Sequence, residues 1–207
     1  MAESIWPTIH AEREALANDL DGLTREQWET PSLCSEWNVH QVLAHQLSAA
    51  KMTPLKFFGK FAAAGFNFDK FAGRQVVLEA ASDPGVTLAA FRAASGRTSA
   101  PPGPKDTWLG EAFVHGEDIR RPLGISRQYP LPEVARALAF YAKSNAIIGG
   151  RNRVAGVTMK ATDTDFEVGT GPVVEGSAIS LLLAASGRKS AIDDLTGPGA
   201  DVLRSRP

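Results

Sequence analysis

The chain has 207 residues, of which 43% are hydrophobic and 22% charged, a composition typical of a globular protein with one medium-sized domain and room for a small appendage. Its 22 Lys and Arg residues balance its 23 Asp and Glu residues, so the charge points to no nucleic acid and no strongly basic partner. A single cysteine, Cys34, excludes an intrachain disulfide, and no secretory signal or bilayer-spanning apolar run is visible. We therefore expect a cytoplasmic protein with no membrane partner, either monomeric or homodimeric.

Helical periodicity dominates the first two thirds of the chain. Capping residues, prolines and glycines mark the expected helix ends: Thr24 with Gln27 forms a capping box, and Asn38 precedes the longest helix. The expected helices cover residues 4–20, a short turn ending near 28, 39 to about 61, 68–82, 84–95, 106–121 and 132–148, the last closed by two glycines at 149–150.

The pattern changes near residue 152. Residues 157–162 alternate between apolar and polar, which predicts a strand, and 166–168 and 173–175 predict a second strand and an edge strand. Ser177 is expected to cap a helix that ends at Gly187, and Ser190 with Asp193 predicts another capping box for a short helix ended by Gly197. The expected fold is therefore an all-helical domain over residues 1–152, followed by a small α+β domain over residues 153–207.

Glu111 and His115 are the most informative pair in the sequence. Positions i and i+4 share one helix face, and a carboxylate with an imidazole is a normal part of a zinc site. In helical projection Glu111, His115 and Asp118 lie in the middle of an apolar stripe, where an unpaired carboxylate would be costly and a divalent cation would compensate it. A simple Glu–His ion pair that supports the helix is the alternative.

His45 lies on the apolar side of the helix expected from residue 39, so it is the leading candidate for a third ligand. In a helical bundle, metal sites are built from inward side chains of different helices. Two imidazoles and one carboxylate would leave a coordination position open, as in catalytic zinc sites. A lone histidine on an apolar face can equally be a satisfied core residue.

Two motifs carry a family resemblance. Residues 31–45, Pro-Ser-Leu-Cys-Ser-Glu-Trp-Asn-Val-His-Gln-Val-Leu-Ala-His, resemble the entry into the metal helix of the DinB-like superfamily, and residues 111–118 resemble its second signature, Glu-x-x-x-His-Gly-x-Asp. The branch they most resemble includes mycothiol-dependent maleylpyruvate isomerase. The resemblance implies a four-helix bundle, a divalent metal (usually zinc, with nickel possible after purification) held by His45, Glu111 and His115, and mycothiol as co-substrate.

Three other residues each allow a functional and, in two cases, a purely structural interpretation. Asp118 can orient an imidazole from outside the ligand set or accept a proton. Arg188, which recurs in similar C-terminal domains, can bind a substrate carboxylate or complement the end of its helix. Cys34 can be a redox thiol or a metal ligand, or a small residue packed under Trp37.

Together with the candidate ligands, the resemblance implies a metal-dependent enzyme that activates a low-molecular-weight thiol for isomerisation or S-transfer on a small electrophile. Coordination to a metal deprotonates a thiol, which fits this chemistry. Two alternatives remain open on the sequence. One is a non-catalytic module that binds a small molecule, and the other is a metal-dependent hydrolase that uses bound water.

Overall fold

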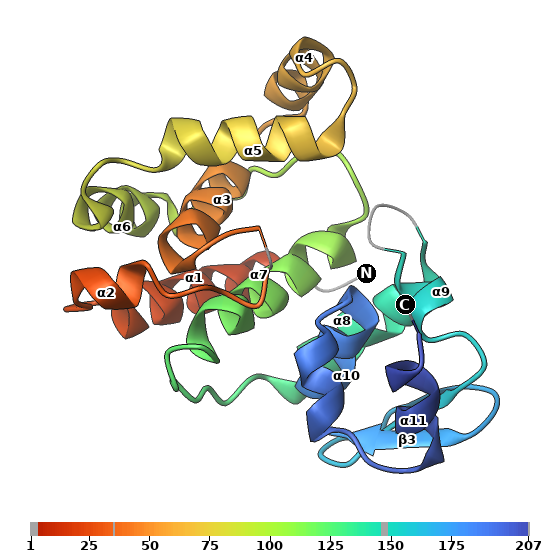
Figure 1. Cartoon of the computed structure of the whole chain (residues 1–207). Coiled ribbons are helices and arrows are strands. Elements are labelled where there is room, and N and C mark those ends of the chain that lie inside the picture. The colour runs from red at the N-terminus through yellow and green to blue at the C-terminus, as the bar shows by residue number, and fades with distance from the viewer. Residues whose placement is uncertain (1–3, 35, 146–148, 207) are drawn as a thin grey trace. The chain divides into compact units, whose positions relative to one another are not determined.

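The computed structural model describes residues 4–34, 36–145 and 149–206 (Figure 1). The chain is mostly helical and ends in a small mixed α+β region with a three-stranded sheet, as predicted. It divides into two compact units, Met1–Trp108 with His115–Ser126 and Leu109–Val114 with Arg127–Pro207. The predicted domain boundary near residue 152 stays a prediction, and the compact units differ from it by grouping residues 127–152 with the C-terminal elements.

The first unit consists of helices whose order follows the prediction. Their bounds are α1 Trp6–Asp19, α2 Arg25–Trp28, α3 Val39–Lys51, α4 Pro54–Ala63, α5 Phe68–Glu79, α6 Pro84–Ala94 and α7 Lys105–Arg120, the last of which contributes residues to both units. Thr24 and Asn38 each accept a hydrogen bond from the backbone three residues on, and Gln27 and Gln41 reciprocate, so the first predicted capping box and the Asn38 cap are confirmed.

The single helix expected from residue 39 to about 61 is wrong, because the chain breaks between Lys51 and Pro54. Thr53 has an extended backbone and its side chain accepts from the N–H of Lys56, so it caps a separate helix. Pro54 occupies the first helical turn, where its missing N–H is tolerated. The apolar periodicity continues across this break, which is why the sequence pattern alone conceals it.

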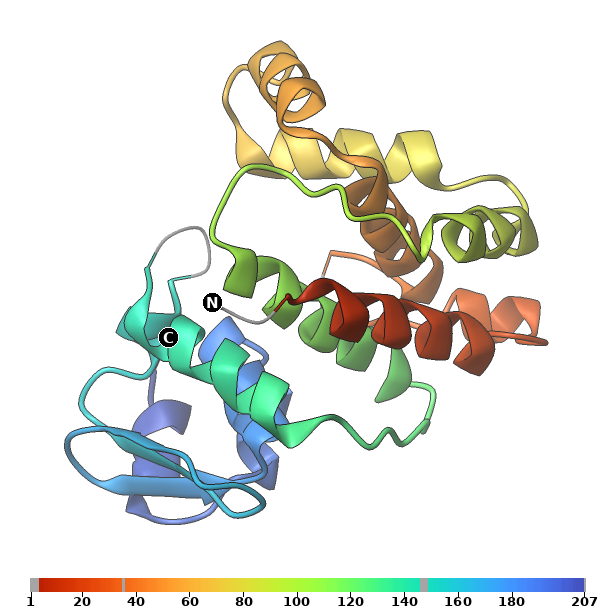
Figure 2. The same cartoon turned by 180° about the vertical axis from the view of Figure 1, so that it is seen from behind.

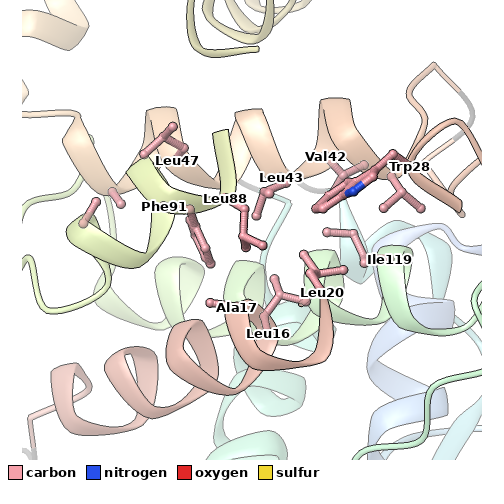
Figure 3. Close-up of a cluster of buried hydrophobic side chains, with 13 residues drawn as sticks. Leu16, Ala17, Leu20, Trp28, Val42, Leu43, Leu47, Leu88, Phe91 and Ile119 are labelled. Atoms are coloured by element: carbon pink, nitrogen blue, oxygen red, sulfur yellow. The ribbon is translucent and has the colours of Figure 1, made fainter. Parts of the chain in front are cut away.

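One hydrophobic cluster joins α1, α2, α3, α6 and α7 (Figure 3). Its buried members are Leu16, Ala17, Leu20, Trp28, Val39, Val42, Leu43, Leu47, Ala50, Leu88, Phe91, Ala94 and Ile119. Burying each large apolar side chain contributes about 1.5–3 kcal/mol. Ile119 brings α7 into this cluster beside the residues of α3, and these two helices carry the predicted histidines.

The second unit combines helices with the sheet, whose β1–β2 hairpin is visible from behind (Figure 2). Its elements are α8 Leu131–Lys143, α9 Gly150–Arg153, β1 Thr158–Ala161, β2 Glu167–Gly169, β3 Val173–Gly176, α10 Ala178–Ser186, a 3-10 helix Lys189–Asp194 and α11 Pro198–Arg204. The strand order is β2-β1-β3, with β1 antiparallel to β2 and parallel to β3. Met159 and Ala161 are buried and Lys160 is exposed, which confirms the predicted alternation.

Three predicted features near the C-terminus need correction or lie outside the described chain. Helix α8 ends at Lys143, and the predicted end at residue 148 falls among residues 146–148, outside the described part. The capping box at Ser190 is wrong, because Ser190 lies within the 3-10 helix and Arg188 precedes it without a side-chain cap. Gly197 ends no helix; it precedes α11, which begins at Pro198 and was not predicted. Within the described residues, no helix is long and apolar enough to cross a membrane.

Candidate functional site

Two histidines from different helices of the first unit meet at close range. His45 lies on α3 and His115 on α7, with ring centroids 4.8 Å apart and ring planes at 68°. Both side chains are half-buried. The indole of Trp37 packs against the ring of His45, and the centroids of these two rings are 4.9 Å apart. The predicted pairing of His45 with His115 is thus present in the structure as a contact between imidazoles.

The loop before α3 holds Trp37 in place through its own hydrogen bonds. The hydroxyl of Ser32 donates to the Trp37 carbonyl oxygen at 2.6 Å and accepts from the N–H of Cys34 at 3.0 Å. The N–H of Leu33 donates to the backbone oxygen of Asp118 at 3.1 Å, which ties the loop to α7. The loop therefore sets the position of the indole beside His45.

Asp118 is fully buried and supports His115 directly. Its Oδ2 lies 2.8 Å from Nδ1 of His115, three residues earlier on the same helix. A carboxylate only accepts hydrogen bonds, so Nδ1 is the nitrogen that carries a proton in this contact. The other ring nitrogen, Nε2, is then left for a ligand or a transferable proton, which is the arrangement commonly found behind metal-binding histidines.

Glu111 is half-buried on α7, one turn before His115, but its contacts group it with the second unit. Across residues 4–34, 36–145 and 149–206, no three or more His, Cys, Asp and Glu side chains gather in a group that could hold a metal ion. The structure therefore brings together two of the three predicted ligands. The complete set stays a prediction.

Helix α7 is buried on more than one side, so an apolar stripe along it does not by itself mark a ligand face. Glu117 and Arg120 are both charged, yet they are only 6% and 0% exposed. Glu117 pairs with Arg121 at 2.7 Å, and Arg120 pairs with Asp19 at 2.7 Å. Ion pairs thus compensate charge on this helix without a cation, and burial alone does not distinguish the ligand face.

Cys34 and Arg188 each make a contact of the structural kind, and the functional roles predicted for them stay predictions. Cys34 is half-buried and packs with Trp37 against the hydrophobic cluster. Arg188 lies in the second unit, where its Nη1 donates to the carbonyl oxygen of Ser186 at 3.2 Å, at the end of α10. The predicted contact of Arg188 with a substrate carboxylate stays a prediction.

A cleft of about 1030 Å³ in the first unit is lined partly by residues from α2, α3 and α6. His40 lies in it, with Nε2 2.9 Å from the Thr87 hydroxyl and the Trp28 ring packed edge-on. Burial lowers the pKa of His40 below its ordinary value, and the negative charge of Asp83 opposes this only in part. The fold therefore favours the neutral imidazole at this position.

We expect the stability contribution of His40 to be present above its ordinary pKa, about 6.5, and to be lost as the pH falls below it. The unfolded chain binds a proton there more readily than the folded chain, so acid favours unfolding. The melting temperature should fall between about pH 7.5 and 5.5 more steeply for the unmodified protein than for His40→Gln. Thermal unfolding followed by circular dichroism measures both slopes, and equal slopes would contradict the assignment.

Comparison with known proteins identifies the architecture. Residues 9–111 match the family model of the mycothiol maleylpyruvate isomerase N-terminal domain. The crystal structure of the mycothiol-dependent maleylpyruvate isomerase is similar to this chain with a TM-score of 0.63 at 14% identity, and a histidine-to-alanine mutant of it with 0.62 at 15%. Each comparison covers 95% of this chain and 92% of the solved chain, so the likeness of fold extends over both units. No curated protein sequence matches significantly.

Proposed function

The chain belongs to the mycothiol maleylpyruvate isomerase family by its N-terminal domain, residues 9–111, and we propose that it is an enzyme that uses a low-molecular-weight thiol, mycothiol in the first place. The thiol would act on a small electrophile by isomerisation or S-transfer. One observation carries the proposal: two imidazoles from separate helices, His45 and His115, lie in contact and one of them is backed by a buried carboxylate.

The imidazole pair fits a divalent metal. Two imidazoles on one tetrahedral zinc, each with a Zn–N distance of about 2.0–2.1 Å, place their ring centroids roughly 5 Å apart, and the centroids of His45 and His115 are 4.8 Å apart. We propose these two residues with Glu111 as the ligands of a divalent ion, zinc first and nickel as an alternative occupant. Such an ion, when bound, makes a thiol available as the thiolate at neutral pH.

The side chains around the pair have separate tasks in this proposal. Asp118 keeps the proton on Nδ1 of His115 and fixes the ring orientation, which leaves Nε2 as the ligand atom. Trp37 packs beside His45 and limits the rotation of that ring. A co-substrate thiolate that adds to an activated double bond and leaves after rotation gives isomerisation, whereas one that stays gives an S-conjugate.

Turnover that depends on added thiol is the expected result of the deciding experiment. The purified protein is assayed with maleylpyruvate and a panel of other small electrophiles, with and without mycothiol, and its metal content is measured in parallel. We expect thiol-dependent turnover and about one zinc or nickel per chain. Thiol-independent hydrolysis would favour the hydrolase instead, and a folded protein with no turnover and no metal would favour the binding module.

A further inference from the structure

Helix α4 and the turn after it expose large apolar side chains. None of the residues of α4 is fully buried. Leu55 is 85% exposed, Phe58 60%, Phe66 72% and Phe68 46%. We call residues 53–74 the α4–α5 tip; in both views of the chain, α4 lies on the far side of α5 from α1 (Figures 1 and 2). Exposed large apolar residues that gather on one segment mark a site of interaction with a protein, a membrane or a ligand.

The outward side chains are held on a firm base of other aromatic residues. Phe57 stacks on Phe61 at 5.4 Å, and Phe71 packs edge-on against both, at 5.2 and 6.0 Å. These three rings form a small cluster with Met52 and Ala64. Because these rings pack against each other, they hold the inner face of α4, and Leu55 and Phe58 point outward from the same helix.

Phe66 is presented by an unfavourable backbone conformation. It has a φ of 58°, directly after Gly65 with a φ of 69°. Its N–H bonds to the carbonyl oxygen of Phe61, which closes the end of α4, and the two rings meet at 5.6 Å. The left-handed region is unfavourable for a residue that carries a Cβ atom. Phe66 keeps this unfavourable backbone conformation although 72% of its surface is exposed to solvent.

Positive charge surrounds these apolar groups. The tip carries Lys56, Lys60, Lys70 and Arg74 against one acidic residue, Asp69, although the whole chain has a net charge of -1. Two copies of the tip packed on each other would bring like charges together, which disfavours self-association. Aromatic and leucine side chains flanked by lysine and arginine are instead the pattern of a segment that lies in the interface of an anionic bilayer.

We propose that the α4–α5 tip binds the surface of anionic lipid membranes, with Leu55, Phe58 and Phe66 inserted at the headgroup level and Lys56 and Lys70 facing the lipid phosphates. The expectation of no membrane partner rested on the lack of a spanning segment. Binding at the interface needs no such segment, so the proposal replaces that expectation. An acidic protein is the competing partner for the same charge and apolar pattern, and a second copy of this chain is the other.

Co-sedimentation with vesicles tests the proposal on the full chain. We expect binding to vesicles of phosphatidylcholine with about one third phosphatidylglycerol, weak binding to phosphatidylcholine alone, and a loss of binding in high salt. Lys56→Gln and Lys70→Gln should each weaken vesicle binding about fivefold, since one basic residue near the membrane surface contributes about 1 kcal/mol. Leu55→Ser with Phe58→Ser should weaken it at least about tenfold.

Matched variants separate lipid binding from a change in the fold. Val77→Ser with Leu78→Ser removes equally exposed apolar residues of α5 outside the tip and should bind as the unmodified protein does. Phe66→Asn removes the aromatic group while suiting the left-handed backbone, so it should fold and bind less. The proposal would be overturned by a lack of binding to anionic vesicles, or by an equal loss of binding in the α5 control. It would also be overturned if light scattering found a dimer that Phe58→Ser dissociates.

Discussion

Replacing Arg120 with methionine is expected to lower the free energy of unfolding by about 3–5 kcal/mol. The guanidinium is fully buried, with Nε 2.7 Å from Oδ2 of Asp19 and Nη1 3.9 Å from Oε2 of Glu12. Glu12 is itself only 3% exposed. Methionine fills much of the same space, so the main change is the loss of the positive charge. The buried carboxylate of Glu12 then stays in the interior without the guanidinium beside it.

Urea unfolding of three variants checks the reason as well as the size of this effect. Arg25→Met removes an arginine from the exposed ion pair with Glu29 and should change stability by no more than about 1 kcal/mol. Adding Glu12→Gln to Arg120→Met should restore part of the loss, because the neutral side chain is less costly to bury. A loss in Arg120→Met as small as in Arg25→Met would contradict the buried-charge explanation.

Local signals in the sequence predicted much of the fold. Thr24, Asn38 and Ser177 cap helices as predicted, and Gly187 ends α10 with a left-handed backbone. Each of these outcomes depends on hydrogen bonds between residues two to five apart, so neighbouring residues are sufficient to predict it. The alternating strand at 158–161 is predictable for the same reason, because its period of two is a local property.

Contacts between residues far apart in the sequence could not be predicted from such local signals. Arg120 pairs with Asp19, which is 101 residues away. In the sequence, an arginine close to Glu117 and Asp118 looks like part of a solvated charged run. The same limit applies to the site: the spacing in α7 predicts that Asp118 can reach His115, whereas the contact of His45 with His115 depends on how α3 and α7 pack through the hydrophobic cluster. The predicted role of Glu111 as a third ligand stays a prediction, since no metal-binding group of three or more such side chains is found among the described residues.

Asp118→Asn is expected to reduce metal affinity, and turnover with thiol, by roughly 10–100-fold while leaving the fold intact. The amide has nearly the volume of the carboxylate, so the buried position stays filled. It carries no charge, however, and holds the proton on Nδ1 of His115 less strongly, so Nε2 becomes a weaker ligand and the ring less well oriented. His115→Ala removes the ligand itself and should abolish stoichiometric metal.

Metal titration by isothermal calorimetry, beside steady-state rates at saturating thiol, measures these effects. Glu117→Gln is the matched control: it neutralises the adjacent carboxylate of α7, whose partner is Arg121 rather than an imidazole, and should leave metal affinity within about twofold. If Asp118→Asn and Glu117→Gln weaken binding equally, Asp118 supports only the helix. If His115→Ala keeps its metal, His45 and His115 are a packed pair of core imidazoles, and the ligand assignment fails with them.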